Sequence, residues 1–390
     1  MAPLVRLAMP TLGVMLVIGA GAVLRGAEEA AKQIAVDDAK IGLAPYVWKC
    51  SGAGPAARAE ATMPGAYLKA AFQGSTTVGL RIDGTANQGC PAPSMPVVEF
   101  SVDEGPLKVV PLTKTGDLYT LSLAEGLDAA TPHRFVLYFR AADLFQNRWR
   151  GSTAHLRIAG IELAPGGSLL SCPKLPKRAI GFGDSITEGV GVDGLFTSWQ
   201  LLGVSNARAT WLPIVSAGLG CEYGQLGSGG QGMSTTSMAM PPLVETWDHY
   251  DAATSRLTGK LLLPEPDYVF CAIGTNDFQQ DSSRPLNITK DYTRWLTAVR
   301  AACPHARIFC IVPPFGWHAA EVQAAVATRN AAGDGKVHLI DTAPIRAGVR
   351  PGNKATILAY DGVHPSLYGN ALLGALIAVE VQKALNSDGR

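Results

Sequence analysis

The chain has 390 residues, of which 47% are hydrophobic and 17% are charged, a composition typical of globular rather than disordered proteins. Its 33 Lys and Arg residues nearly balance its 32 Asp and Glu residues, and the basic residues form no cluster. No nucleic-acid partner is therefore expected. The length is sufficient for two hydrophobic cores, and the charge balance suits a neutral ester or polysaccharide.

The N-terminal segment has the features of a secretory leader. Residues 1–6 carry one positive side chain, Leu7–Leu24 is uncharged and mostly apolar, and Ala20–Ala22 offers a small-residue cleavage site. We therefore predict a signal peptide within residues 1–27 and a secreted or periplasmic protein. An uncleaved single-span anchor is the alternative, which Pro10 disfavours. Membrane contact is expected only through this leader.

Seven cysteines are compatible with disulfides in that compartment, although an odd number leaves at least one thiol unpaired. The pairing does not follow from the sequence. No two cysteines have zinc-site spacing with histidines nearby, so no metal and no other cofactor is expected.

Residues 40–165 show the alternation of β-strands. Val78, Leu80 and Ile82 alternate with small or polar residues, and the turn Asp83-Gly84 follows them. Other segments with strand character are Tyr67–Phe72, Val98–Val102, Lys108–Leu112, Leu118–Leu123, Phe135–Phe139 and His155–Leu163. About seven short strands with no convincing helix between them predict an all-β sandwich.

A linker is predicted at 166–177, after which the pattern changes. Over residues 178–390 the expected strands are Ala179–Phe182, Tyr268–Ile273, Ile308–Val312 and Val337–Ile340, and the expected helices are Asn287–Ala302, Ala319–Ala332 and Pro365–Leu385. Continuous apolar strands separated by helices predict an α/β domain, with a parallel sheet covered on both faces. Ligands of such sheets bind beyond the carboxyl ends of the strands.

Ser185 directly follows the first of these strands. A serine there can expose its hydroxyl, and the helix behind it aims backbone N–H groups at incoming negative charge. The alternative is a serine that only caps the helix. The residues around Ser185 do not form the G-x-S-x-G elbow of the α/β-hydrolases.

Asp361 and His364 lie three residues apart on a predicted tight turn before the last helix. Serine is a poor nucleophile unless a base takes its proton and a carboxylate fixes the tautomer of that base. At this spacing Asp361 can hydrogen-bond His364 while the imidazole faces Ser185. The alternatives are a surface turn and a metal-ligand pair, for which no third ligand is evident.

Two further segments offer hydrogen-bond donors. Asn276 follows the strand Tyr268–Ile273 and can donate to a developing oxyanion, although its neighbours also favour a simple turn. Gly227–Gly232 presents bare backbone N–H groups. It also matches the G-x-G-x-x-G pattern of dinucleotide sites, which is disfavoured because Pro241-Pro242 cuts the following helix short.

These four segments resemble, in order, the sequence blocks of the SGNH (GDSL) hydrolases, over about residues 178–385. The resemblance implies a serine esterase with Ser185 as nucleophile, His364 as base and Asp361 as the carboxylate that orients the base. It also implies an oxyanion hole made by the N–H groups of Ser185 and Gly230 and by the side chain of Asn276. Gly232 is the alternative to Gly230.

The sandwich narrows the resemblance. A jelly-roll-like domain joined by a short linker to an SGNH domain is similar to carbohydrate esterase family 2, whose members remove acetyl groups from plant-type polysaccharides. His133–Tyr138 and Ile161–Leu163 look like parts of that family's first domain. The chain departs from a minimal SGNH domain in residues 190–210 and 240–263, which carry Trp199 and Trp247 and are expected to form walls over the site.

Trp317, Asp184 and Gly274 are assigned to substrate binding. The Trp317 indole can stack on a sugar ring, with a core or anchoring role as the alternative. The implied reaction is removal of acetyl or other short acyl groups from carbohydrate esters by a monomer without cofactor. The alternatives are a periplasmic polysaccharide O-acetyltransferase with the same triad and a non-catalytic carbohydrate-binding envelope protein.

Overall fold

The computed structural model describes residues 30–195, 201–238, 240–278, 286–314, 316–346 and 356–388. The predicted leader (1–27) and Trp199 lie outside these ranges. Residues 32–170 form a β-sandwich, and an α/β domain begins at Lys177. The predicted combination of an all-β domain with a parallel-sheet domain is confirmed.

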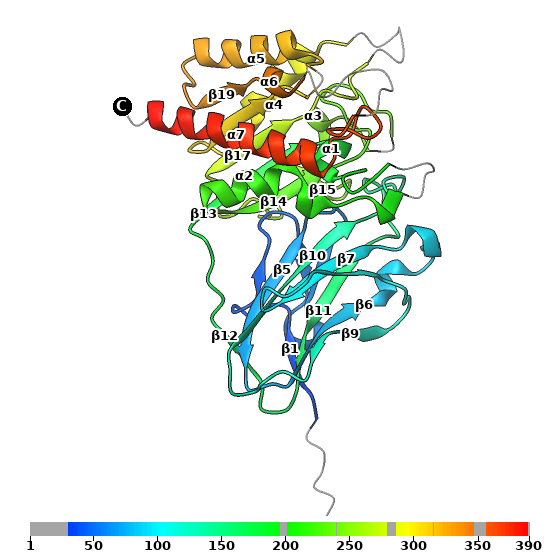
Figure 1. The fold of residues 1–390 in the computed structure, drawn as a ribbon. Helices are drawn as coiled ribbons and strands as arrows, with labels where there is room; N and C mark the ends of the chain where they lie inside the picture. Colours follow the sequence, from blue (N-terminus) through cyan, green and yellow to red (C-terminus); the bar gives the residue numbers. More distant parts are fainter. Residues whose placement is uncertain are drawn as a thin grey trace, which may run out of the picture. The chain divides into compact units, whose positions relative to one another are not determined.

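The sandwich consists of two antiparallel six-stranded sheets (Figure 1). The first contains β3 (Lys49–Ser51), β4 (Arg58–Ala61), β11 (Leu156–Leu163), β6 (Thr77–Asp83) and β9 (Leu118–Glu125), with β1 (Lys32–Ala35) paired to β11. The second contains β12 (Ser168–Leu170), β5 (Tyr67–Gln73), β10 (His133–Ala141), β7 (Val97–Val102) and β8 (Lys108–Pro111), with β2 (Gly42–Leu43) paired to β5. The alternation in β6 buries Val78, Leu80 and Ile82 in the core.

The sandwich extends beyond its expected boundaries at both ends. β1 begins before residue 40 and pairs Ile34 with Ile161. β12 lies inside the predicted linker and pairs Leu169 with Phe72. Both strands are too short to show alternation, so the sequence pattern missed them. The connection between the domains is therefore only residues 171–176.

The α/β domain has a five-stranded parallel sheet in the order β14 (Cys221–Gly227), β13 (Lys177–Gly183), β17 (Tyr268–Ala272), β18 (Arg307–Ile311), β19 (Val337–Ile340). Its helices are α1 (Ser185–Glu188), α2 (Trp211–Leu219), α3 (Leu243–Thr246), α4 (Ile288–Ala302), α5 (Ala319–Ala331), α6 (Ala343–Arg346) and α7 (Leu367–Asp388). α2 packs on α7, and α4 packs on α5 (Figure 1). In the described ranges, none of the helices could cross a bilayer by length and apolarity.

All seven cysteines are free thiols in the structure. Cys271 and Cys310 are paired neighbours in β17 and β18 and are completely buried. They pack as small apolar core residues, as expected for cysteines inside central strands.

Polar contacts connect the two domains. Glu222 in β14 accepts hydrogen bonds from the Tyr67 hydroxyl and, at 2.6 Å, from Lys69 Nζ. Residues 240–263 also reach the sandwich, where the Tyr250 hydroxyl donates to the Glu60 carbonyl and Arg256 donates to the Tyr46 carbonyl. This segment therefore packs against the sandwich, and Trp247 is buried; that the segment forms a wall over the site stays a prediction.

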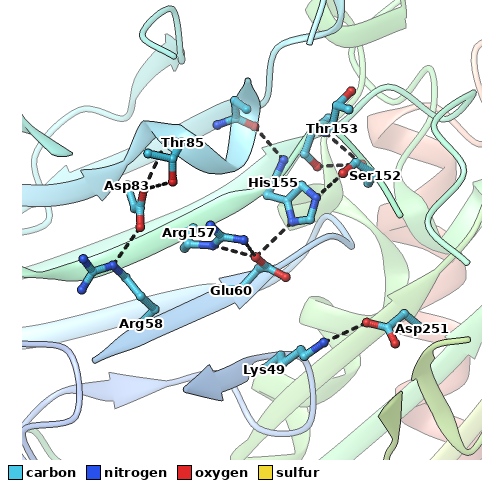
Figure 2. A network of polar contacts seen from close by, with 12 residues as sticks. Lys49, Arg58, Glu60, Asp83, Thr85, Ser152, Thr153, His155, Arg157 and Asp251 are labelled. Atoms are coloured by element: carbon cyan, nitrogen blue, oxygen red, sulfur yellow. Dashed lines mark hydrogen bonds and ion pairs between the residues drawn. The ribbon is translucent and has the colours of Figure 1, made fainter. Parts of the chain in front are cut away.

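Figure 2 shows a polar network on β3, β4 and β11. The Arg157 guanidinium donates to the Glu60 carboxylate through Nε at 2.7 Å and also through Nη2. The His155 ring lies 3.3 Å from the same carboxylate. Lys49 forms an ion pair with Asp251 of the α/β domain at 3.0 Å. Burial alone would raise the pKa of Glu60, but His155 and Arg157 outweigh burial and lower it to about 2.

We predict that Glu60→Gln lowers the free energy of unfolding at pH 7 by about 1.5–3 kcal/mol, the usual contribution of hydrogen bonds to a charged group. Because the folded-state pKa is depressed, this stability exists above the unfolded pKa and is lost as pH falls towards about 2. Urea unfolding at pH 7 and at pH 3 measures the difference, which should shrink at the lower pH. Glu380→Gln, which breaks an exposed pair with Lys383, is the control and should change little. An equal loss at both pH values would contradict the prediction.

Candidate active site

The serine turn is built by close packing at the end of β13. A Cβ on Gly183 would lie 2.0 Å from the Thr187 hydroxyl, so only glycine allows the chain to turn here. Asp184 caps α1, because its Oδ1 accepts the N–H of Ile186 at 2.9 Å. Ser185 is therefore the first helical residue, and it is 8% exposed. The serine lies at the carboxyl end of a central strand, where the sequence predicted a reactive group.

His364 and Asp361 meet Ser185 from the turn before α7. His364 Nε2 lies 2.8 Å from Ser185 Oγ, and His364 Nδ1 lies 2.6 Å from Asp361 Oδ2. The other Asp361 oxygen accepts the N–H groups of Val363 and His364 at 2.8 and 2.7 Å. The three side chains thus form one continuous hydrogen-bonded chain, a geometry that allows direct proton transfer from the serine to the imidazole.

The Asp361 carboxylate is held in its ionised form. Burial alone would raise its pKa, but the hydrogen bond and charge of the His364 ring, with the two backbone N–H groups, outweigh burial and lower it. An ionised carboxylate against Nδ1 keeps the proton on that nitrogen and leaves Nε2 as an acceptor. The imidazole is therefore oriented and in the tautomer that a general base requires.

Two backbone donors within the described residues, one in the serine turn and one in residues 227–232, have no acceptor. Among the described residues, the N–H groups of Ser185 and Gly230 have no acceptor, whereas the N–H of Gly232 donates to the Thr235 carbonyl at 2.8 Å. Of Gly230 and Gly232, Gly230 is therefore the one whose backbone N–H is available to an oxyanion. Asn276 Nδ2 donates to the Gln231 carbonyl at 3.1 Å, which fixes the amide beside this loop and leaves its second hydrogen.

Asp277 anchors the residues that directly follow the glycine loop (227–232). Its carboxylate accepts the N–H groups of Met233, Ser234 and Thr235 at 2.6, 2.7 and 3.0 Å. Burial raises the pKa of Asp277, and these three hydrogen bonds favour its ionised form. The sequence assigned Asp277 no role; its signal was an acidic residue next to Asn276 at the end of a buried strand.

The substrate-binding assignments of Asp184 and Gly274 are corrected. Asp184 is completely buried as a helix cap, and burial raises its pKa to about 6. Gly274 is buried with φ +140°, and a Cβ there would lie 3.1 Å from the Pro313 ring. Both residues shape the backbone under the site and are not exposed to a substrate. Trp317 is 39% exposed and its carbonyl lies near Gly274, at the same sheet edge.

No cluster of three or more potential metal ligands occurs within the ranges that the structure describes. His318 Nε2 donates to the Asp277 carbonyl at 2.6 Å, and His133 Nδ1 lies 2.6 Å from the Asp103 carboxylate. Both histidines thus have protein partners in structural positions.

Comparison with known proteins finds a family model that matches part of the chain. Residues 182–372 match the model of the GDSL-like lipase/acylhydrolase family. The cellulase/esterase CelE of Acetivibrio thermocellus is 25% identical over 293 residues, which is 73% of this chain and 34% of CelE. The chain therefore spans about a third of the length of this curated relative.

Solved structures match both domains. A family two carbohydrate esterase from Clostridium thermocellum, in complex with cellohexaose, is 19% identical with a TM-score of 0.69, covering 89% of this chain and 99% of that chain. An acetyl xylan esterase from the rumen bacterium Butyrivibrio proteoclasticus is 16% identical with a TM-score of 0.68, covering 91% and 99%. Most of the α/β domain thus matches the GDSL-like lipase/acylhydrolase model, and the two domains together have the fold of the solved family two carbohydrate esterases.

Proposed function

We propose that the protein is a serine esterase that removes acetyl or other short acyl groups from carbohydrate esters. The observation that carries the proposal is the hydrogen-bonded chain from Ser185 through His364 to Asp361. It lies within the segment that matches the acylhydrolase family, beside the unpaired N–H groups of Ser185 and Gly230. A nucleophile, an oriented base and oxyanion donors are the groups that acyl transfer requires.

The reaction proceeds in two steps. His364 Nε2 takes the proton of Ser185 Oγ as the oxygen attacks the ester carbonyl, and Ser185, Gly230 and Asn276 donate to the resulting oxyanion. Collapse breaks the bond to the sugar oxygen, which takes the proton from His364 and leaves an acyl-serine. Water, activated by the same imidazole, then releases the acid and restores Ser185.

A carbohydrate as substrate is supported by the similar structures. One was solved with cellohexaose, and another is an acetyl xylan esterase. In this chain, Trp317 is 39% exposed, and an indole is a side chain on which a sugar ring can stack. A polysaccharide substrate also agrees with export through the predicted leader, and we retain a secreted or periplasmic location as part of the proposal.

Release of free acetate from acetylated xylan and acetylated cello-oligosaccharides tests the proposal directly. Hydrolysis predicts acetate in stoichiometric amount with the esters lost. A periplasmic O-acetyltransferase would instead move acetyl groups to an added acceptor oligosaccharide, with little free acetate. Absence of both products, together with no labelling of Ser185 by a fluorophosphonate, would favour the non-catalytic binding protein.

We predict that Ser185→Ala lowers kcat on p-nitrophenyl acetate by at least about 10³-fold, because no other group can form the acyl intermediate. The far-UV circular dichroism and melting temperature should stay close to those of the wild type. Ser216→Ala removes another buried hydroxyl, on α2, and serves as the matched control with unchanged kcat. Turnover by Ser185→Ala equal to that of this control would exclude Ser185 as the nucleophile.

The oxyanion assignment predicts that Asn276→Ala lowers kcat by about 10²–10³-fold with a small change in KM, because the donor acts mainly on the transition state. Asn276→Asp keeps the size of the side chain but replaces the donor with a negative acceptor, so it should be at least as slow. Steady-state kinetics on p-nitrophenyl acetate measure both. A rise in KM with unchanged kcat would assign Asn276 to ground-state binding instead.

We predict that kcat/KM falls as the pH is lowered into the acid range, because an imidazole that has gained a second proton cannot take the proton of Ser185. Asp361 does not cause this fall, because its depressed pKa keeps it ionised there. Asp184, with a pKa of about 6, titrates in the same range. The Asp184→Asn variant keeps a helix cap, and its kcat/KM must therefore still fall at acid pH. If kcat/KM of this variant did not fall at acid pH, the fall in the wild type would be due to Asp184.

A further inference from the structure

An arginine of the sandwich domain reaches the serine turn of the α/β domain. Arg148 lies in the loop between β10 and β11, and it forms an ion pair with Glu188, the last residue of α1. Both side chains are only 2% exposed. Since α1 begins at Ser185, this carboxylate stands one helical turn from the nucleophile.

The second oxygen of Glu188 holds the glycine loop. Glu188 Oε2 accepts the N–H of Gly229 at 2.6 Å, and the next peptide carries the unpaired N–H of Gly230. One carboxylate thus connects an arginine of the sandwich to the backbone that presents the oxyanion donor. Just beyond the other end of the loop, the Asp277 carboxylate accepts the N–H groups of Met233 and Ser234.

The packing around this contact leaves little freedom for the loop. A Cβ on Gly227 would lie 2.3 Å from the backbone nitrogen of Glu188, so the loop and α1 are in direct contact. A Cβ on Gly229 would lie 3.3 Å from both Glu188 Oε2 and the Cβ of Leu144, which belongs to the same sandwich loop as Arg148. The sandwich therefore contacts the glycine loop directly as well as through Glu188.

We propose that Arg148 and Glu188 are positioning residues of the oxyanion hole, through which the sandwich domain sets the orientation of the Gly230 N–H. This inference rests on the proposed function. A buried carboxylate without its cation is strongly destabilised and must turn out, gain a proton or draw in water. Each response loosens the bond to Gly229. The donor at Gly230 then loses the preorganisation on which oxyanion stabilisation depends.

The test compares Arg148→Met with Arg140→Met. Arg140 is the matched control, because it is also a buried sandwich arginine and also forms an ion pair with the α/β domain, at Asp193, without contacting the glycine loop. Arg148→Met should lower kcat on p-nitrophenyl acetate by about 10–10²-fold with KM changed less than about threefold. Arg140→Met should lower the melting temperature comparably while kcat stays within about threefold of the wild type.

A second measurement separates positioning from general damage. A trifluoromethyl ketone adds to the serine and places an oxyanion in the hole, so its inhibition constant should rise in Arg148→Met by the same factor as kcat/KM falls. Arg148→Lys, which restores the charge, should recover part of both. Glu188→Gln, which keeps an amide oxygen near Gly229 but removes the ion pair, should show an intermediate loss. If Arg148→Met does not fold, these two variants carry the test.

Two failures are distinguishable. If Ser185→Ala is as active as the wild type, or a fluorophosphonate does not label Ser185, the proposed function itself is wrong. If Ser185 is required but the Arg148 and Glu188 variants match Arg140→Met in kcat and in the inhibition constant, the pair is only a structural link between domains and the inference is overturned.

Discussion

The hydrogen bond between Ser185 Oγ and His364 Nε2 joins groups 179 residues apart in the chain, and the chemistry depends on its length. The length of this hydrogen bond is set by contacts that lie away from the serine. Asn370 in α7 donates to the Pro365 carbonyl and accepts the N–H of Trp211 at the start of α2, so the histidine turn is fixed to a helix beside β14. A displacement of about 1 Å can cost about 10²-fold in rate, which explains why polar anchors are buried this far from the serine.

The aspartates around the site divide into two groups by their surroundings. Asp184 and Asp277 lie where burial raises the pKa, and both accept backbone N–H groups that they hold in place. Asp361 lies where the charge and hydrogen bonds of His364 outweigh burial and lower the pKa. The first two shape the backbone of the serine turn and the glycine loop, and the third supports the imidazole. The carboxylate that hydrogen-bonds the imidazole is the one suited to support a general base.

The sequence predicted the reactive groups because parallel strands end at one edge of a sheet. Ser185 and Asn276 directly follow buried strands, and the spacing of Asp361 and His364 fits one turn. The order of strands does not predict the direction of a side chain. Asp184 and Gly274 were therefore assigned to substrate binding, although both are buried. Adjacency in sequence says which residues are near a site and not which way they point.

Long-range contacts account for what the pattern missed in the fold. β1 and β12 are short, and each is a strand because a longer neighbour, β11 or β5, offers unpaired backbone groups. β14 contains Glu222 and Gln225, so it does not resemble a buried strand. Both side chains are satisfied, Glu222 by Lys69 of the sandwich and Gln225 by the Thr187 carbonyl. A polar residue is admitted to a buried strand when its partner comes from another element.

Contacts from the sandwich domain also support the serine turn of the α/β domain. The acylhydrolase match begins at residue 182, after the sandwich has ended, yet the cation that neutralises Glu188 comes from residue 148. An α/β domain without the sandwich would lose this cation and the cover that residues 144 and 148 give to the glycine loop. It would also leave Glu222 and the Tyr250 hydroxyl without their hydrogen-bond partners in the sandwich. The sandwich is therefore part of the structure that holds the serine turn, and the sequence blocks of the hydrolase describe a site whose support lies partly outside them.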